Sequence, residues 1–198
     1  MYRVEIIAVS DEYDLSELPL SAADYVNQAK GLARKERAAG MLLLGKLLKA
    51  EGIEEYAVSV TENGKPFLVG IPIHFSVSHA GGACAVAISD SPVGIDLQDA
   101  DSVKRIKDPT AFVSRFFTVE ESESFLNAPT HRELSRLWTK KEALVKLLGF
   151  RLSDSLSSLS TKNYPCVEFE TSEITLDKLF YLTVATEINK QPLPKQQQ

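Results

Sequence analysis

The order of predicted elements most constrains the fold of this 198-residue chain, because one order occurs twice. Strand-like runs rich in β-branched residues and a stretch with helical spacing make up the first half: strands at 3–9, 56–60, 73–78 and 83–89, and a helix at 21–50. After a break at Pro92 the second half follows, with strands at 93–97, 156–159, 167–170 and 180–186, and helices at 111–127 and 132–149. The repeated order favours an α+β fold of two similar halves.

We expect the halves to span residues 1–91 and 92–190, followed by a frayed tail rich in Pro and Gln at 191–198. Turns are predicted where Asn63-Gly64 and Gly81-Gly82 separate strands. The helix at 21–50 should bury the apolar side chains that share one face, namely Leu32, Ala39, Leu43, Leu44, Leu47 and Leu48.

Charge and cysteine usage narrow the class of protein. The chain has 22 basic and 27 acidic residues, a net charge of −5, so its mean field disfavours nucleic acid and anionic membranes. Cys84 and Cys166 form no CxxC pair, which favours a reducing compartment. No signal peptide precedes the first strand, and no apolar run reaches the roughly 18 residues of a membrane span. We therefore expect a soluble cytoplasmic protein.

Common catalytic motifs are missing from the sequence. It contains no G-x-x-x-x-G-K-[ST], G-x-G-x-x-G, H-E-x-x-H or G-x-S-x-G pattern. His74, His79 and His131 lack the spacing of zinc ligands. Simple hydrolases and P-loop kinases are thereby disfavoured.

Two polar segments lie at strand ends. Ser78 and His79 precede Gly81-Gly82, where side-chain donors and backbone N–H groups can approach a phosphate, or where an ordinary hairpin turn leaves the histidine partly exposed. Asp96 lies between Ile95 and Leu97, so it faces away from both. Its carboxylate points either into a cleft, as a ligand for a hard divalent cation, or into solvent.

A third polar segment lies on the last predicted helix. Trp138, Glu142 and Lys146 are four residues apart and share one face. The buried stripe should comprise Leu134, Leu137, Leu144, Leu147 and Leu148. Taken alone, Glu142 and Lys146 are equally consistent with a surface ion pair that contributes only about 0.3–0.5 kcal/mol.

Five segments together resemble the 4′-phosphopantetheinyl transferases of the surfactin-synthetase-activating (Sfp-like) type. They are Asn63-Gly64-Lys65-Pro66, Ser78-His79 with Gly81, Gly94-Ile95-Asp96, Arg115-Phe116-Phe117-Thr118 with Glu120-Glu121, and Trp138-Thr139 with Lys141-Glu142 and Lys146. The resemblance covers about residues 43–159. It implies the family's fold, in which two α+β halves have a pseudo-two-fold arrangement, and a monomer, because one chain supplies both halves.

The resemblance also implies an activity, namely transfer of phosphopantetheine from coenzyme A to a serine of an apo acyl, polyketide or peptidyl carrier protein, with release of 3′,5′-ADP. It assigns Asp96 and Glu142 as ligands of Mg²⁺, with Mn²⁺ as an alternative, and Glu142 as the base, directly or through water. Lys146 would offset charge on the phosphates. Where the family often has a second acid this chain has Gln98, which we expect to coordinate weakly through its carbonyl or through water.

Further contacts follow from the same resemblance. Ser78 and His79 would contact the 3′-phosphate of coenzyme A, and Lys65 and Pro66 would border the adenine. Basic residues of the first helix would face the phosphates, or form a solvated basic face: Lys30, Arg34 and Arg37.

The sequence leaves the carrier contact and the activity itself open. The basic segment with Lys104, Arg105, Lys107 and Arg115, near three phenylalanines, is either the carrier-docking surface or a solvated loop. Loss of the second acid leaves a non-catalytic coenzyme A-binding regulator as an alternative function, and a carrier-binding module without a nucleotide role as a third.

Overall fold

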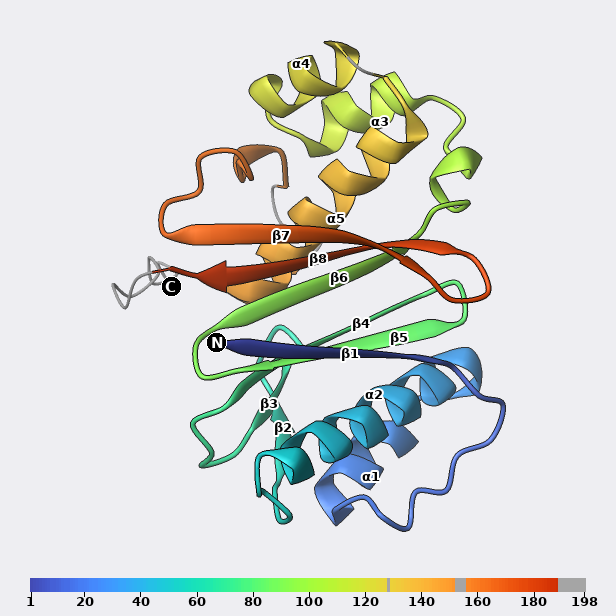
Figure 1. The fold of residues 1–198 in the computed structure, drawn as a ribbon, viewed down its shortest axis with the longest axis vertical. Helices are drawn as coiled ribbons and strands as arrows, with labels where there is room; N and C mark the ends of the chain where they lie inside the picture. Colours follow the sequence, from blue (N-terminus) through green and yellow to red (C-terminus); the bar gives the residue numbers. More distant parts are fainter. Residues whose placement is uncertain (128, 152–155, 189–198) are drawn as a thin grey trace.

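The computed structural model describes residues 1–127, 129–151 and 156–188. Figure 1 shows the first half below the second, each with a sheet and helices of its own. The first half has a three-stranded antiparallel sheet in the order β1-β5-β4, a two-stranded hairpin β2-β3 and two helices. Their bounds are β1 Tyr2–Ala8, α1 Leu20–Asn27, α2 Gly31–Ala50, β2 Val58–Val60, β3 Pro66–Leu68, β4 His74–Ala80 and β5 Ala83–Ser89.

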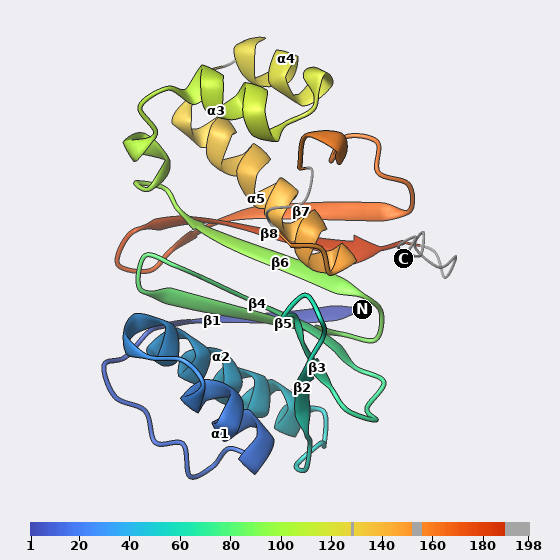
Figure 2. The same cartoon turned by 180° about the vertical axis from the view of Figure 1, so that it is seen from behind.

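The second half has an antiparallel sheet in the order β6-β8-β7 and three helices, of which α5 is the longest. Their bounds are β6 Val93–Asp99, α3 Pro109–Phe116, α4 Val119–Asn127, α5 His131–Leu148, β7 Val167–Thr175 and β8 Leu179–Glu187. Short 3₁₀ turns occupy Val103–Arg105 and Leu156–Ser158. The predicted α+β fold is confirmed. Figure 2, from behind, shows α3 and α4 at the far end of the second half.

Several predicted elements differ from the structure. The helix predicted at 21–50 is two helices, α1 and α2, and the stretch at 111–127 is likewise divided into α3 and α4. Residues 156–158 form a 3₁₀ turn, so the strand predicted at 156–159 is wrong. Leu32 is 64% exposed, because it lies in the first turn of α2, before the buried part of the helix begins at Ala38. The predicted tail at 191–198 lies outside the described residues.

Side chains along β5 point alternately to its two faces, and each face belongs to a separate hydrophobic core. Cys84, Val86 and Ile88 pack on one face with the side chains of α2. Alanines occupy the other face, where they meet β6 and β8: Ala83, Ala85 and Ala87 pack with Val93, Ile95, Leu97, Phe180, Leu182 and Val184. Because this second core draws on both sheets, burial of its apolar surface holds the halves together.

Strands β4 and β6 meet along a seam that serine side chains bridge. Ser76 Oγ accepts a hydrogen bond from the Ile95 N–H at 3.1 Å, and Ser78 Oγ accepts one from the Leu97 N–H at 3.0 Å. Each hydroxyl replaces the carbonyl group of a neighbouring strand, so the N–H groups of Ile95 and Leu97 are satisfied. We call these contacts the serine seam.

Helix α5 lies directly against β6. A Cβ at Gly94 would lie 2.0 Å from the Ala143 carbonyl oxygen and 2.4 Å from the Leu147 nitrogen, so no side chain fits there. The helix begins at Thr130, whose Oγ1 accepts a hydrogen bond from the Glu133 N–H, and ends at Gly149, whose φ of 71° suits glycine. This close packing determines which residues of α5 lie opposite Gly94 of β6.

None of the helices in the described parts of the chain is both long and apolar enough to cross a membrane.

Candidate functional site

Asp96 and Glu142, predicted as a pair from distant segments, lie side by side. Asp96 is on the face of β6 opposite Ile95 and Leu97 and is 2% exposed, so it does not point into solvent. Glu142 reaches it from α5. Burial, and then the neighbouring Asp96 carboxylate, raise the pKa of Glu142 to about 8, whereas Lys146 opposes the shift. The environment therefore disfavours a second negative charge beside Asp96 unless a proton or a further cation accompanies it.

The two oxygens of Asp96 have different environments. Oδ1 accepts hydrogen bonds from the Ser78 hydroxyl at 2.9 Å and from Lys146 Nζ at 2.7 Å. Lys146 Nζ also donates to Ser78 Oγ at 2.8 Å. Oδ2 is buried and accepts from no N–H or hydroxyl group among the described residues. Such an oxygen is costly unless a cation or a proton satisfies it. A hydrogen bond between the Asp96 and Glu142 side chains, which requires a proton on one of the two carboxyl groups, also contributes to the raised pKa of Glu142.

A hard divalent cation fits these residues. A buried carboxylate close to a second, partly buried carboxyl group is the donor chemistry that Mg²⁺ takes, with substrate phosphates and waters as further ligands. Within the described ranges no group of three or more His, Cys, Asp and Glu side chains is placed to hold a metal. The Gln98 amide donates to Ser102 Oγ, in the turn after β6, which directs this predicted ligand toward that turn.

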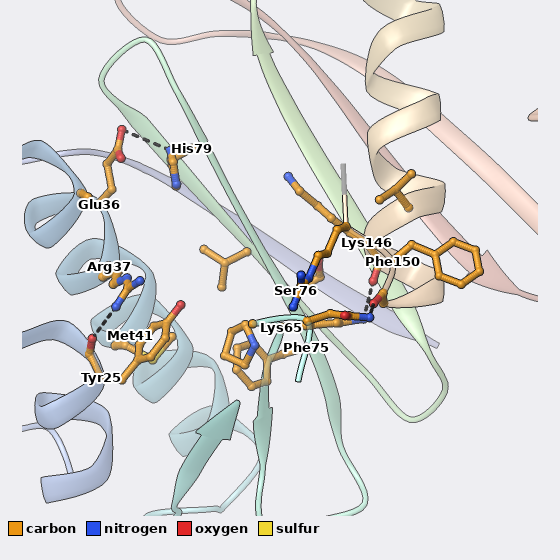
Figure 3. Close-up of a pocket in the computed structure, with 18 residues that line it drawn as sticks. Tyr25, Glu36, Arg37, Met41, Lys65, Phe75, Ser76, His79, Lys146 and Phe150 are labelled. Atoms are coloured by element: carbon orange, nitrogen blue, oxygen red, sulfur yellow. Dashed lines mark hydrogen bonds and ion pairs between the residues drawn. The ribbon is translucent and has the colours of Figure 1, made fainter. Parts of the chain in front are cut away.

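A cavity of about 490 Å³ opens between the halves. Asp96 and Glu142 are not part of its lining; Lys146, which lines it, connects it to them through its hydrogen bond to Asp96. Figure 3 shows Glu36 and His79 at one end, and Lys65, Lys146 and Phe150 at the other. Its walls come from α2, the turn before β3, strand β4 and the end of α5. Five of the residues predicted to bind coenzyme A line it: Arg37, Lys65, Pro66, His79 and Lys146.

Three other predicted contacts lie outside that lining. Ser78 is 3% exposed and its hydroxyl belongs to the serine seam. Lys30 and Arg34 are exposed at the start of α2, and Arg34 donates to Asn27 Oδ1 at 3.2 Å. Of the three basic residues proposed for the first helix, the structure thus brings Arg37 to the cavity.

Two basic groups on the α2 side of the cavity are held in place. The Arg37 guanidinium donates to the Tyr25 carbonyl at 2.9 Å and stacks over the Tyr25 ring, 4.4 Å from its centroid. His79 Nδ1 lies 3.2 Å from Glu36 Oε1, while about half of the imidazole stays exposed. Both side chains are therefore oriented before any ligand arrives (Figure 3).

Lys65 joins the first half to the end of α5. Its Nζ donates to the Lys146 carbonyl at 2.5 Å and to the Val93 carbonyl at 3.4 Å. Burial lowers the pKa of Lys65 to about 8. Carbonyls at a helix C-terminus attract cations, which suits this contact.

Asn63, which the sequence analysis did not single out as a site residue, makes a parallel contact. Its Nδ2 donates to the Gly149 carbonyl at 2.9 Å, and Arg151 donates to the Glu62 carbonyl at 3.1 Å. We call these contacts, together with that of Lys65, the turn clamp. The sequence did contain a clue to this contact, because the Asn63-Gly64 turn directly precedes Lys65 and places the Asn63 amide close to the lysine.

Lys141 and Glu142 are neighbours in sequence but face different surroundings. Lys141 is fully buried and donates to Glu121 Oε2 at 2.6 Å; Glu121 is also fully buried. The other oxygen of Glu121 accepts hydrogen bonds from the N–H and hydroxyl of Thr161. This pair ties α4, α5 and the segment after α5 together, a structural role that the sequence analysis missed.

Aromatic side chains surround Trp138 on the same helix. Phe112, Phe116 and Phe117 lie with ring centroids 5.0, 5.6 and 6.1 Å from that of Trp138. Arg115 lies over the Phe116 ring at 5.1 Å, and Lys104 pairs with Asp101 at 2.6 Å. The cluster supports α3 against α5, close to the segment predicted to contact a carrier.

Comparison with known proteins assigns the chain to a family. The model of the 4′-phosphopantetheinyl transferase superfamily matches residues 92–190, which include Asp96, Glu142 and Lys146. The chain belongs to the 4′-phosphopantetheinyl transferase superfamily.

Similar curated proteins carry matching names. The chain is 35% identical to the 4′-phosphopantetheinyl transferase psf-1 of Bacillus pumilus, over 61% of this chain and 54% of that protein. It is 32% identical to the 4′-phosphopantetheinyl transferase AcpT of Salmonella typhi, over 75% of each. It is 33% identical to a holo-[acyl-carrier-protein] synthase of Staphylococcus epidermidis, over 39% of this chain and 74% of that protein. The matches with the first two Bacillus relatives span about half of their length.

Proposed function

We propose that this protein transfers 4′-phosphopantetheine from coenzyme A to a serine of an apo acyl, polyketide or peptidyl carrier protein and releases 3′,5′-ADP. The observation that carries the proposal is the close pair of Asp96 and Glu142, which Lys146 connects to the cavity between the halves. The superfamily match and the names of the relatives support the same reaction.

Asp96 and Glu142 would hold Mg²⁺, with Mn²⁺ as a substitute. When bound, this cation supplies charge neutralisation on the pyrophosphate of coenzyme A. Gln98 is neutral and adds no third carboxylate. We therefore expect the protein without substrate to bind the metal more weakly than it would with an acid at this position. Phosphate oxygens of the substrate would then contribute to metal retention.

In the proposed reaction, the serine oxygen of the carrier attacks the β-phosphorus of coenzyme A. A phosphoester bond forms there, and the bond to 3′,5′-ADP breaks. Glu142 accepts the serine proton, directly or through a water. Lys146, whose ammonium group lies 2.7 Å from Asp96 Oδ1, offsets charge that develops on the leaving phosphate.

The cavity residues would divide coenzyme A between them. His79 and Arg37 lie at the α2 side, where they would contact the 3′-phosphate and its neighbours. Lys65 and Pro66 would border the adenine, with Phe75 and Met41 as apolar wall. This division leaves Lys146 for the pyrophosphate, nearest the two carboxyl groups.

We also propose a monomer, since one chain supplies both walls of the cavity. Docking of the carrier would use the basic segment with Lys104, Arg105, Lys107 and Arg115 near the aromatic cluster, because acidic helices of carriers need local positive charge. Two unpaired cysteines, Cys84 and Cys166, favour a cytoplasmic location.

Mass spectrometry tests the reaction directly. The protein is incubated with coenzyme A, Mg²⁺ and apo carriers of the three types, and at least one carrier should gain the mass of the phosphopantetheine arm. A chelator should abolish the gain. Coenzyme A binding without transfer to any carrier would instead identify a regulator, and carrier binding alone would identify an interaction module.

A further inference from the structure

The Ser78 hydroxyl is at the centre of the carboxylate site. It donates to Asp96 Oδ1 at 2.9 Å, and it accepts from Lys146 Nζ at 2.8 Å and from the Leu97 N–H at 3.0 Å. A serine hydroxyl has one donor and two acceptor positions. All three are therefore occupied, and none is left for a phosphate.

We propose that Ser78 is a positioning residue for Asp96 rather than a contact to coenzyme A. Its hydroxyl fixes Oδ1, so that Oδ2 accepts from neither Ser78 nor Lys146 and can turn to a cation. The inference rests on the proposed function, because the metal is the one that transfer requires.

The alternative supports of Asp96 are weaker. Lys146 is the other donor to Oδ1, but its side chain is one-quarter exposed and ends a flexible stem. Ser78 instead is on a strand paired along its whole length with β5, and its exposed fraction is 3%. Without the hydroxyl, the carboxylate would retain only Lys146 and Glu142, whose side chains are partly buried, and it could rotate.

The seam provides a matched control within the same strand. Ser76 Oγ also accepts a hydrogen bond from a β6 backbone N–H, that of Ile95 at 3.1 Å, and Ser76 is 4% exposed. Among the described residues, no hydrogen bond links Ser76 to Asp96 or Lys146. Ser76→Ala therefore removes the same kind of strand bridge as Ser78→Ala but leaves the carboxylate contact intact.

The test is a titration of the metal-free protein with Mn²⁺, followed by electron paramagnetic resonance, without coenzyme A or carrier. Loss of groups that orient metal ligands typically costs about 10–100-fold in affinity. We expect the dissociation constant for Mn²⁺ to rise at least about tenfold in Ser78→Ala and to change by less than about twofold in Ser76→Ala. Ser78→Cys, whose thiol is a weak donor, should fall between wild type and Ser78→Ala.

Crystal structures of the two alanine variants give a readout that does not depend on metal. Asp96 should change rotamer or occupy several in Ser78→Ala, and keep the wild-type rotamer in Ser76→Ala. Equal Mn²⁺ affinities in the three seam variants, or an unchanged Asp96 in Ser78→Ala, would overturn the assignment. So would a loss of coenzyme A binding, without a loss of dephospho-coenzyme A binding, in Ser78→Ala. A wild type that binds no Mn²⁺ would count against the proposed metal site, and the crystal structures would then decide on Ser78.

Discussion

Glu142 is held in conditions that favour its protonated form. Desolvation comes first and the adjacent Asp96 second, and together they bring the pKa to about 8. A cation held by Asp96 and Glu142 would take the place of this proton and would offset both effects. The features that raise the pKa of Glu142 would therefore also favour metal binding.

Stability should depend on pH through this group. In the unfolded chain Glu142 loses its proton near its ordinary pKa of 4.5, whereas in the folded, metal-free protein it keeps the proton up to about pH 8. Between these two pH values the folded protein therefore binds one proton more than the unfolded chain. The free energy of unfolding should accordingly fall as pH rises across this window, by up to about 1.4 kcal/mol per pH unit. Denaturant titrations in a chelator at several pH values measure this slope.

Two comparisons identify the source of the slope. Glu142→Gln should flatten it, because its amide does not titrate, and should lower transfer by at least about 10²-fold. Saturating Mg²⁺ should reduce the slope in the wild type. A slope that persists unchanged in Glu142→Gln would assign it to other groups.

At the scale of elements, the contact of α5 with β6 requires a residue without a side chain. Gly94→Ala would place a methyl group within 2.0 Å of the Ala143 carbonyl oxygen, a backbone atom that cannot turn aside. We expect a loss of about 3 kcal/mol or more of unfolding free energy, from displacement of the helix. Thermal or denaturant unfolding checks this.

Gly52→Ala serves as a control, because alanine at position 52 would strain the backbone without the steric clash expected at position 94. A Cβ at Gly52 would meet no atom within 4 Å, although its φ of 78° disfavours alanine. Its cost should be closer to about 1 kcal/mol. Equal losses at the two positions would contradict the close approach of α5 to β6.

The buried pair of Lys141 and Glu121 fastens α5 to the segment that follows it. Lys141→Met leaves the Glu121 carboxylate without its cation in a fully buried setting, for which we expect a loss of about 3–5 kcal/mol. Glu121→Gln combined with Lys141→Met should lose less than Lys141→Met alone. A double-mutant cycle of unfolding free energies measures the coupling.

Local patterns predicted much at this scale. Alternation around Asp96 predicted its direction, and the Gly81-Gly82 turn predicted the β4–β5 hairpin, because both depend on neighbours in sequence. The break between α1 and α2 and the exposure of Leu32 depend on where each helix meets the sheet. Helical periodicity carries no such information.

The residues of the candidate site also fall into those that the sequence could predict and those that depend on the fold. Asp96, Glu142 and Lys146 could be paired through the family's motifs, and the structure brings them together. The fully buried Lys141 could not be predicted, since Lys at a helix position next to Glu142 is typical of a surface. The turn clamp joins residues more than eighty positions apart, such as Asn63 and Gly149, and no local pattern records it.

For the whole molecule, the turn clamp is a further link between the halves, in addition to their shared core and the serine seam. Asn63→Ala removes the hydrogen bond to the Gly149 carbonyl and frees one wall of the cavity. We expect a rise of about three- to tenfold in the KM for coenzyme A with little change in kcat, because the carboxyl pair is on β6 and α5. Steady-state transfer kinetics measure both.

An exposed asparagine provides the control. Asn163 donates to Glu120 at 3.2 Å, away from the cavity lining, so Asn163→Ala should leave both constants unchanged. A fall in kcat without a change in KM in Asn63→Ala would show that the clamp acts on the reacting groups instead of on coenzyme A.

The alanine face of β5, packed on β6 and β8, makes each half depend on the other. A chain with the first half alone would leave that apolar surface exposed to water, and a chain with the second half alone would do the same. Either half expressed by itself should therefore self-associate, because stable monomers rarely expose an apolar sheet face of this kind.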